Sequence, residues 1–234
     1  MSASSDLRPR PLLPNRVPRS PRALLAGVSA LLTAVAFSDL FAVYAGVRAY
    51  TLIDEDRGFA LASQQELDDA DALYQRAGHI QSVAFLVCAV VFIVWFYWMR
   101  RDGGVLGPDR FRNGPGWAIG SWFIPLANFW MPYRIAVDIW GASTRLPADG
   151  EPYKASFWPV NLWWGLFVTT TLFSRYAWRG YLDAEVASEV RDAVLLVMAA
   201  DILDIAAAAA AVHFAVRLTA MQRLKATEGP YASA

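Results

Sequence analysis

Three aspartates lie in stretches of the sequence that are otherwise apolar enough for a lipid bilayer. Asp39 belongs to residues 23–48, and Asp201 and Asp204 belong to residues 193–217. Ionisable side chains are costly inside a membrane and typically mark the path of an ion or a proton. Carboxylates at close range cannot all ionise, so at least one should keep its proton unless a cation binds. The three aspartates therefore predict a proton- or cation-responsive site.

Such a site requires that the helical faces carrying these aspartates meet. Asp201 and Asp204 share one face with Ala208 and Ala211, because their spacing follows the helical repeat. At about 1.5 Å per residue, Asp39 lies roughly 12–14 Å and Asp201 roughly 12 Å below the outer ends of their helices. Two alternatives stay open. The aspartates join helices through hydrogen bonds, or an outer crevice is wet enough to solvate them.

The stretch 23–48 also carries a small residue at every fourth position. Small side chains let a second helix approach closely. The stripe predicts tight packing, either against another helix of the same chain or against a second copy in a homo-oligomer. Its members are Ala26, Ala30, Ala34, Ser38, Ala42 and Gly46.

A second polar group interrupts the aromatic stretch 114–144, which we call the elbow. Arg134 and Asp138 are four residues apart, so on a helix they can pair. Asn128 can bond backbone groups that neighbouring prolines leave unpaired, and Tyr133 can hydrogen-bond at the membrane interface. These residues either line a site for a solute or a lipid headgroup, or satisfy one another in a structural elbow, which the pattern favours.

Four stretches reach the roughly 20 mostly apolar residues that a spanning helix needs. The chain is 56% hydrophobic and 18% charged, against about 45–50% and about 25% in soluble domains. This predicts an all-α polytopic membrane bundle over 23–220, with a disordered Pro/Arg-rich tail before it and a short tail, 221–234, after it. The four predicted spans are residues 23–48, 79–99, 157–178 and 193–217.

The charges of the loops orient this bundle, because cytoplasmic loops are rich in Lys and Arg. Arginines fill the tail 1–22 and recur just after residue 99 and over 217–225, whereas the loops 52–78 and 179–192 are acidic. We therefore expect a multi-pass protein of the cell membrane with both termini in the cytoplasm.

A crossing of the membrane by the elbow would reverse every later loop. The charges agree if the elbow enters and leaves at the inner face, as half-helices over about 115–124 and 132–143. Pro125 and Pro132 support this interpretation, because each breaks helical hydrogen bonding. The elbow is thus predicted to be a re-entrant or interfacial segment, with a kinked fifth span as the alternative.

The sequence holds no pattern typical of an enzyme, a metal site or a cofactor site. The formal net charge is zero, so no nucleic-acid partner is expected. Cys88 is the one cysteine, and His79 and His213 are the two histidines, whereas a zinc site needs about four ligands. Neither a nucleophile-elbow serine nor a metalloprotease, phosphate-loop or dinucleotide motif is present.

The run "GPGWAIGSWFIPLANFWMPYRIAVDIWGAS" resembles a family of bacterial membrane proteins catalogued as domain of unknown function 4328. The shared features are the tryptophan-rich start, the P-x-x-N step, the P-Y-R and the following D-x-W, together with "WPVNLWW" at residues 158–164. The resemblance covers roughly residues 25–220. It implies a multi-helix membrane protein and carries over no activity, cofactor or site residue.

The expected function is that of a non-enzymatic sensing, scaffolding or regulatory protein of the membrane, binding lipid or protein partners. The short loops leave no room for a separate catalytic domain. The alternative is a small proton- or cation-linked transporter or channel subunit, because broken helices and intramembrane aspartates are common in transport sites.

Overall fold

The computed structural model describes residues 22–53, 63–147 and 156–231, and each regular element in these ranges is a helix. The long helices are α1 (Arg22–Ile53), α2 (Gln64–Leu106), α5 (Trp158–Leu182) and α6 (Ala187–Glu228). Between α2 and α5 lie η2 (Pro108–Arg110), α3 (Trp117–Gly120), η3 (Ala127–Phe129) and α4 (Met131–Ser143). The all-helical fold class is therefore confirmed. The predicted N-terminal tail lies outside the described residues, apart from Arg22.

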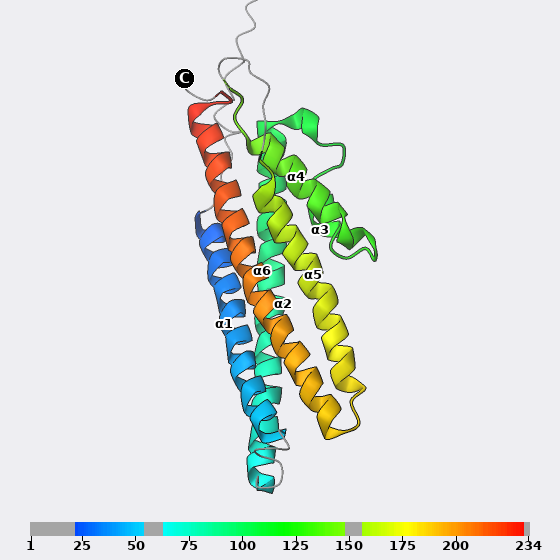
Figure 1. Cartoon of the computed structure of the whole chain (residues 1–234). Helices are drawn as coiled ribbons and strands as arrows, with labels where there is room; N and C mark the ends of the chain where they lie inside the picture. The colour runs from blue at the N-terminus through cyan, green and yellow to red at the C-terminus, as the bar shows by residue number, and fades with distance from the viewer. Residues whose placement is uncertain (1–21, 54–62, 148–155, 232–234) are drawn as a thin grey trace, which may run out of the picture.

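The four long helices lie side by side and alternate in direction along the chain (Figure 1). α1 packs between α2 and α6, and α5 packs along the other side of α6. The short helices cluster at one end of the bundle, where α2 ends, α5 begins and the C-terminus lies (Figure 1). We call this the elbow end and the other the opposite end.

Three helices, α1, α2 and α6, are long and apolar enough to cross a membrane. The fourth predicted span corresponds to α5, which is 25 residues long but is not among these three. Its sequence contains four tryptophans, a run of three threonines, an asparagine and two arginines, which lower its hydropathy.

Two of the helices are much longer than their predicted spans. α2 begins at Gln64 rather than at residue 79, so the polar helix expected in the preceding loop is its first part. Ser63 starts it with a capping box, in which the Ser63 hydroxyl accepts from Glu66 N and a Glu66 carboxylate oxygen accepts from Ser63 N. α6 likewise continues beyond residue 217 to Glu228, because hydropathy marks where lipid contact ends and not where helical hydrogen bonding ends.

Aromatic side chains fill the core towards the elbow end. Trp163 of α5 stacks on Phe214 of α6, with ring centroids 4.5 Å apart and planes 1° apart. Phe92 of α2 lies 5.6 Å from the Trp163 ring and 6.1 Å from that of Trp122 in the elbow. The rings therefore join α2, α5, α6 and the elbow in one hydrophobic cluster.

Towards the opposite end, small residues bring α1 close to α6. A Cβ added at Gly46 would lie 2.6 Å from Met198 Cγ, so the two helices are in contact there. Ser38 and Ala42 of the predicted stripe are buried as well, whereas Ala26, Ala30 and Ala34 are exposed. Part of the stripe thus packs within the chain, and a second copy as its partner stays a prediction.

The elbow leaves and rejoins the bundle at one end (Figure 1). Its first half-helix is shorter than expected, with only Trp117–Gly120 in α-helical conformation, and its second is α4. Leu126 between them has φ 65°, a left-handed conformation that is uncommon for a residue with a side chain. Phe123 and Leu126 are each 71% exposed, so the tip of the elbow is an apolar surface.

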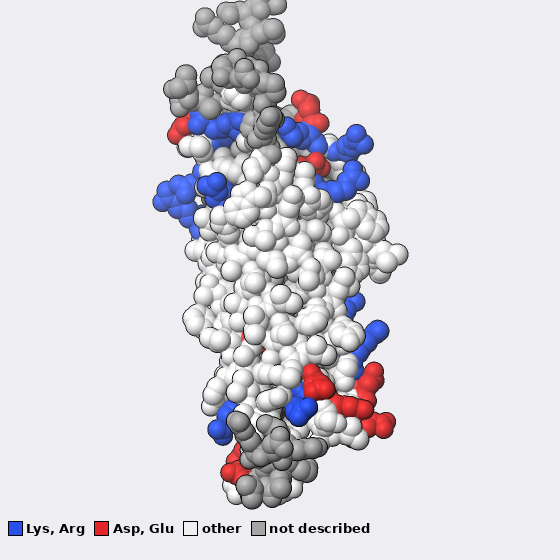
Figure 2. Space-filling model, viewed as in Figure 1, with Lys and Arg blue, Asp and Glu red and all other residues white. Residues whose placement is uncertain are grey.

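Charged side chains gather at the two ends of the molecule. Figure 2 shows Lys and Arg predominating at the elbow end, a mixture with many Asp and Glu at the opposite end, and a nearly uncharged belt between them. This distribution has the form that a bilayer imposes on a protein surface.

Candidate functional site

One glutamine side chain joins two of the three predicted aspartates. Gln81 Nε2 in α2 donates to Asp39 Oδ1 of α1 and to Asp201 Oδ1 of α6, each at 2.9 Å. Asp39 is 4% exposed and Asp201 is 7% exposed. We call these three residues the carboxyl cluster, because they connect three helices at one buried point.

Asp204 takes part in a different contact. Its Oδ1 accepts a hydrogen bond from Thr170 Oγ1 at 2.6 Å, and its Oδ2 accepts from Ser174 Oγ at 3.4 Å. Both hydroxyls belong to α5. The two aspartates of α6 therefore serve different neighbours, with Asp201 facing α1 and α2 and Asp204 facing α5.

The carboxyl cluster offers few donors for the acceptors that it contains. One neutral amide serves two carboxyl groups, and Asp39 Oδ2 is buried with no hydrogen-bond partner among the described residues. Two ionised carboxylates at one amide in a low-dielectric interior would repel each other strongly. The arrangement is electrostatically reasonable when at least one of the two carboxyls carries a proton.

A metal ion is a poor fit to this arrangement. Among the residues that the structure describes, no group of three His, Cys, Asp or Glu side chains is placed to hold one. Asp204 is bonded to hydroxyls of α5 instead of turning towards the other two carboxyls. The geometry thus suits the exchange of a proton better than the binding of a metal.

The four predicted elbow residues do not act as one group. Tyr133 Oη donates to Asn161 Oδ1 of α5 at 2.9 Å, which ties α4 to the start of that helix. Asn128 Oδ1 is buried and lacks a partner among the described residues, so it accepts no hydrogen bond from their backbone. Arg134 and Asp138 form neither a hydrogen bond nor an ion pair with each other, although their spacing permits one. Arg134 is exposed, and an arginine in water gains little from a single ion pair.

Asp138 lies instead among several guanidinium groups. Burial raises the pKa of Asp138, while the positive charges of Arg134, Arg100, Arg110 and Arg112 oppose that rise. Arg100 is 7% exposed, donates to Asn113 O at 2.6 Å and lies 3.6 Å from the centroid of the Phe111 ring. The loop charges predicted an arginine-rich inner face, but they did not predict that arginines surround one carboxylate.

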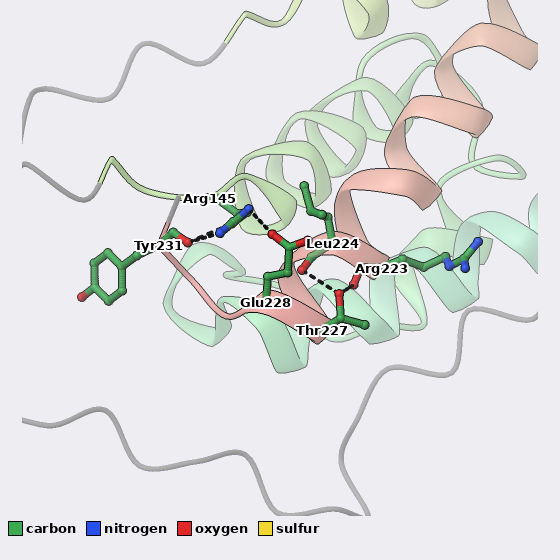
Figure 3. A network of polar contacts seen from close by, with 6 residues as sticks. All are labelled: Arg145, Arg223, Leu224, Thr227, Glu228 and Tyr231. Carbon is green, nitrogen blue, oxygen red and sulfur yellow. Dashed lines mark hydrogen bonds and ion pairs between the residues drawn. The ribbon is translucent and has the colours of Figure 1, made fainter. Parts of the chain in front are cut away.

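Side chains near the C-terminus fasten α6 to the end of α4 (Figure 3). Arg145 Nη1 lies 2.8 Å from Glu228 Oε2, and Arg145 Nε donates to Tyr231 O at 2.9 Å. Lys225 Nζ donates to Ala142 O at 2.8 Å and to Thr144 O at 3.0 Å, two carbonyls at the end of α4. We call these contacts the C-terminal clamp; they join the elbow to the helix that carries Asp201.

Two shallow hollows open on the surface of the described chain. One, of about 460 Å³, lies on the N-terminal half of α2 and is lined by Ala72, Gln75, Arg76, His79 and Ile80. The other, of about 410 Å³, lies in the elbow and is lined by Gly114, Gly116, Trp117, Gly120 and Ile124. Neither is lined by a residue of the carboxyl cluster.

The fold and the buried polar contacts define an all-helical protein with three helices able to cross a membrane. The family described as domain of unknown function (DUF4328) matches residues 59–220, and the chain belongs to this family. The match includes Gln81, Asp201, Asp204 and the whole elbow, but it begins after Asp39, later than the resemblance suggested. No curated protein and no solved structure matches the chain.

Proposed function

We propose that the protein is a non-enzymatic regulator of the cell membrane that responds to protonation of the carboxyl cluster. In this proposal α1, α2, α5 and α6 cross the membrane, the elbow is re-entrant at the inner face and both termini are cytoplasmic. The basic elbow end and the uncharged belt support this placement (Figure 2). The apolar tip of the elbow supports it too, because exposed Phe123 and Leu126 are suited to lipid contact.

The observation that carries the function is the single Gln81 amide shared by Asp39 and Asp201. With a proton on one carboxyl, the amide links α1 and α6 through α2. When both carboxyls ionise, their repulsion opposes the close approach of α1 and α6 at Gly46 and Met198. The protonation state of the cluster is therefore coupled to the packing of these two helices.

The C-terminal clamp connects α6, the helix that carries Asp201, to the elbow at the proposed inner face. α6 carries Asp201 in its first half and Lys225 and Glu228 in its last turn, and this last turn is bonded to the end of α4 and the residues after it. A shift of α6 would therefore also move α4 in the elbow. We assign the elbow the role of the output surface, which binds lipid or protein partners.

Asp201→Asn should abolish a pH-dependent movement of α1 relative to α6. Spin labels at Tyr44 and Leu195, both exposed, would report the distance between the helices by double electron–electron resonance on a Cys88→Ala background. We expect this distance to increase as the pH rises and the second carboxyl ionises. In Asp201→Asn one carboxyl remains, the repulsion is absent and the distance should stay constant.

Asp69→Asn is the matched control, because Asp69 is an exposed aspartate on the polar part of α2. It should leave the pH profile unchanged. A distance that does not depend on pH in the unmodified protein, or the same profile in Asp201→Asn, would contradict the regulatory proposal.

The unpartnered Asp39 Oδ2 favours one alternative, a small proton- or cation-linked transporter or channel subunit with Asp39, Asp201 and Asp204 along its path. The same variants separate the two candidates in reconstituted vesicles. Proton flux that Asp39→Asn and Asp201→Asn abolish would support the transporter. A change of distance without flux would support the regulator.

Cysteine labelling in intact cells tests the proposed topology. On the Cys88→Ala background, single cysteines replace Asp109 before the elbow, Ser156 after it and Asp183 after α5, three exposed positions. A membrane-impermeant thiol reagent should label Asp183→Cys and leave the other two unlabelled until the cells are permeabilised. Labelling of Ser156→Cys together with protection of Asp109→Cys would mean that the elbow crosses the membrane.

A further inference from the structure

The hollow in the elbow, which we call the elbow hollow, is lined by three glycines and two large apolar side chains. A Cβ added at Gly114, Gly116 or Gly120 would meet no heavy atom within 4 Å, so open space lies over all three glycines. Trp117 and Ile124, each 41% exposed, form the sides. None of the five lining residues has a polar side chain apart from the indole of Trp117, so the hollow suits a hydrocarbon chain better than a polar solute.

Basic residues adjoin one end of this hollow along the chain. Gly114 follows Arg112 by two residues, and the carbonyl of the intervening Asn113 accepts from Arg100. Arg110 lies against α4, since a Cβ added at Gly141 would meet its Nη1 and Cζ atoms. Arg110 and Arg112 are exposed.

Positive charge exceeds negative charge in the segment that leads into the hollow. Between Gly107 and Gly114 the chain carries Arg110 and Arg112 against one acidic residue, Asp109. The charges of both arginines also act on the carboxyl of Asp138. Charge complementarity therefore calls for an anion beside the hollow.

We infer that the elbow hollow holds an acyl chain of an anionic phospholipid, whose phosphate lies beside Arg112. The juxtaposition of an apolar hollow and excess arginine fits both parts of such a lipid, whereas a free phosphate would leave the hollow unused. Exposed aromatic rings at Trp117 and Trp130 are typical of the headgroup level of a bilayer. Basic pockets at the cytoplasmic side of membrane helices bind such headgroups.

This inference rests on the proposed placement of the elbow at the inner face, but not on protonation of the carboxyl cluster. A lipid held between the start and the tip of the elbow would oppose its movement. The amount of anionic lipid in the inner leaflet would then set how readily α4 and α6 shift together.

The test measures the preference of the full-length protein for spin-labelled phosphatidylglycerol over spin-labelled phosphatidylcholine in mixed vesicles, by electron paramagnetic resonance. Arg112→Gln should lower this preference about fivefold, the effect of about one basic residue near a membrane surface. Arg223→Gln, an exposed arginine of α6 at the same end, should leave it unchanged. Gly120→Leu should lower the preference as well, because it fills the hollow while keeping every charge.

Equal losses in Arg112→Gln and Arg223→Gln would overturn the inference, since they would indicate general attraction to the basic end. Competition by inorganic phosphate would overturn it too, because the acyl chain would then contribute nothing. In both lipid variants the distance between α1 and α6 should still increase with pH, and Asp201→Asn should keep the lipid preference. Failure of one proposal is thereby distinguished from failure of the other.

Discussion

Replacing Gln81 by leucine is expected to lower the free energy of unfolding by about 2 kcal/mol at neutral pH. The change removes both hydrogen bonds that join Asp39 and Asp201 to α2. Hydrogen bonds between membrane helices average about 0.6 kcal/mol, with a maximum of about 1.7 kcal/mol, and bonds to charged groups are the stronger ones. Two such bonds, of which one can be charge-assisted, therefore contribute between about 1.2 and 3.4 kcal/mol together. The measurement is reversible unfolding in mixed micelles.

Gln75→Leu is the matched control for this prediction. Gln75 lies on the same helix and also donates to an aspartate, Asp71, at 2.9 Å, but its contact is exposed. Its loss should change stability by no more than about 0.5 kcal/mol. At acidic pH the cost of Gln81→Leu should fall, because a neutral carboxyl is less costly to bury without a partner than a charged one. Equal effects of the two substitutions would show that the carboxyl cluster contributes no special stability.

Hydropathy and charge predicted the helices better than they predicted which side chains meet. Apolar stretches located all four long helices, and the depth estimate placed Asp39 and Asp201 at a similar level. Gln81 was missed, although a long amide in an apolar run is a signal that can be looked for. Its partners depend on the rotation of α2 against α1 and α6, which the spacing of residues in one helix does not determine.

The observed contacts of Asp204 and Asp138 differ from the predicted ones for a similar reason. Asp201 and Asp204 are three residues apart and share a face, yet that face is wide enough to contact α1 and α2 on one side and α5 on the other. Arg134 and Asp138 can pair on an isolated helix, but the folded chain brings Arg100, Arg110 and Arg112 near the same carboxylate. Spacing within a helix indicates which contacts are possible, and packing decides among them.

The bounds of the helices depart from prediction for another reason. α2 starts 15 residues before its apolar stretch because Ser63 and Glu66 form a capping box that sequence alone can indicate. α5 was predicted from its length and its aromatic ends, and its hydropathy is lowered both by exposed polar residues, Asn161, Arg175 and Arg179, and by side chains that face the protein. Trp163 and Trp164 are 3% and 8% exposed, and Thr170 is 4% exposed and bonded to Asp204.

Trp163→Ala should therefore be the most damaging of the proposed substitutions, lowering the free energy of unfolding by about 3–5 kcal/mol. Trp163 is 3% exposed, stacks on Phe214 and contacts the rings of Phe92 and Phe96. Its removal would leave a large cavity where α2, α5 and α6 meet. Hydrogen exchange should show the loss first in α5, which carries Trp163 and is the shortest of the four long helices.

Trp158→Ala separates the loss of packing from the loss of a tryptophan. Trp158 lies in the first turn of the same helix, is 53% exposed and stacks on His213 at 5.0 Å. Its loss should cost less than about 1 kcal/mol, because little buried volume disappears. If the two substitutions destabilise equally, α5 is held by its surroundings at the membrane interface. If Trp163→Ala alone is severe, α5 is held in the bundle by its contacts with α2 and α6, which would support the proposal that this helix of modest hydropathy crosses the membrane beside α1, α2 and α6.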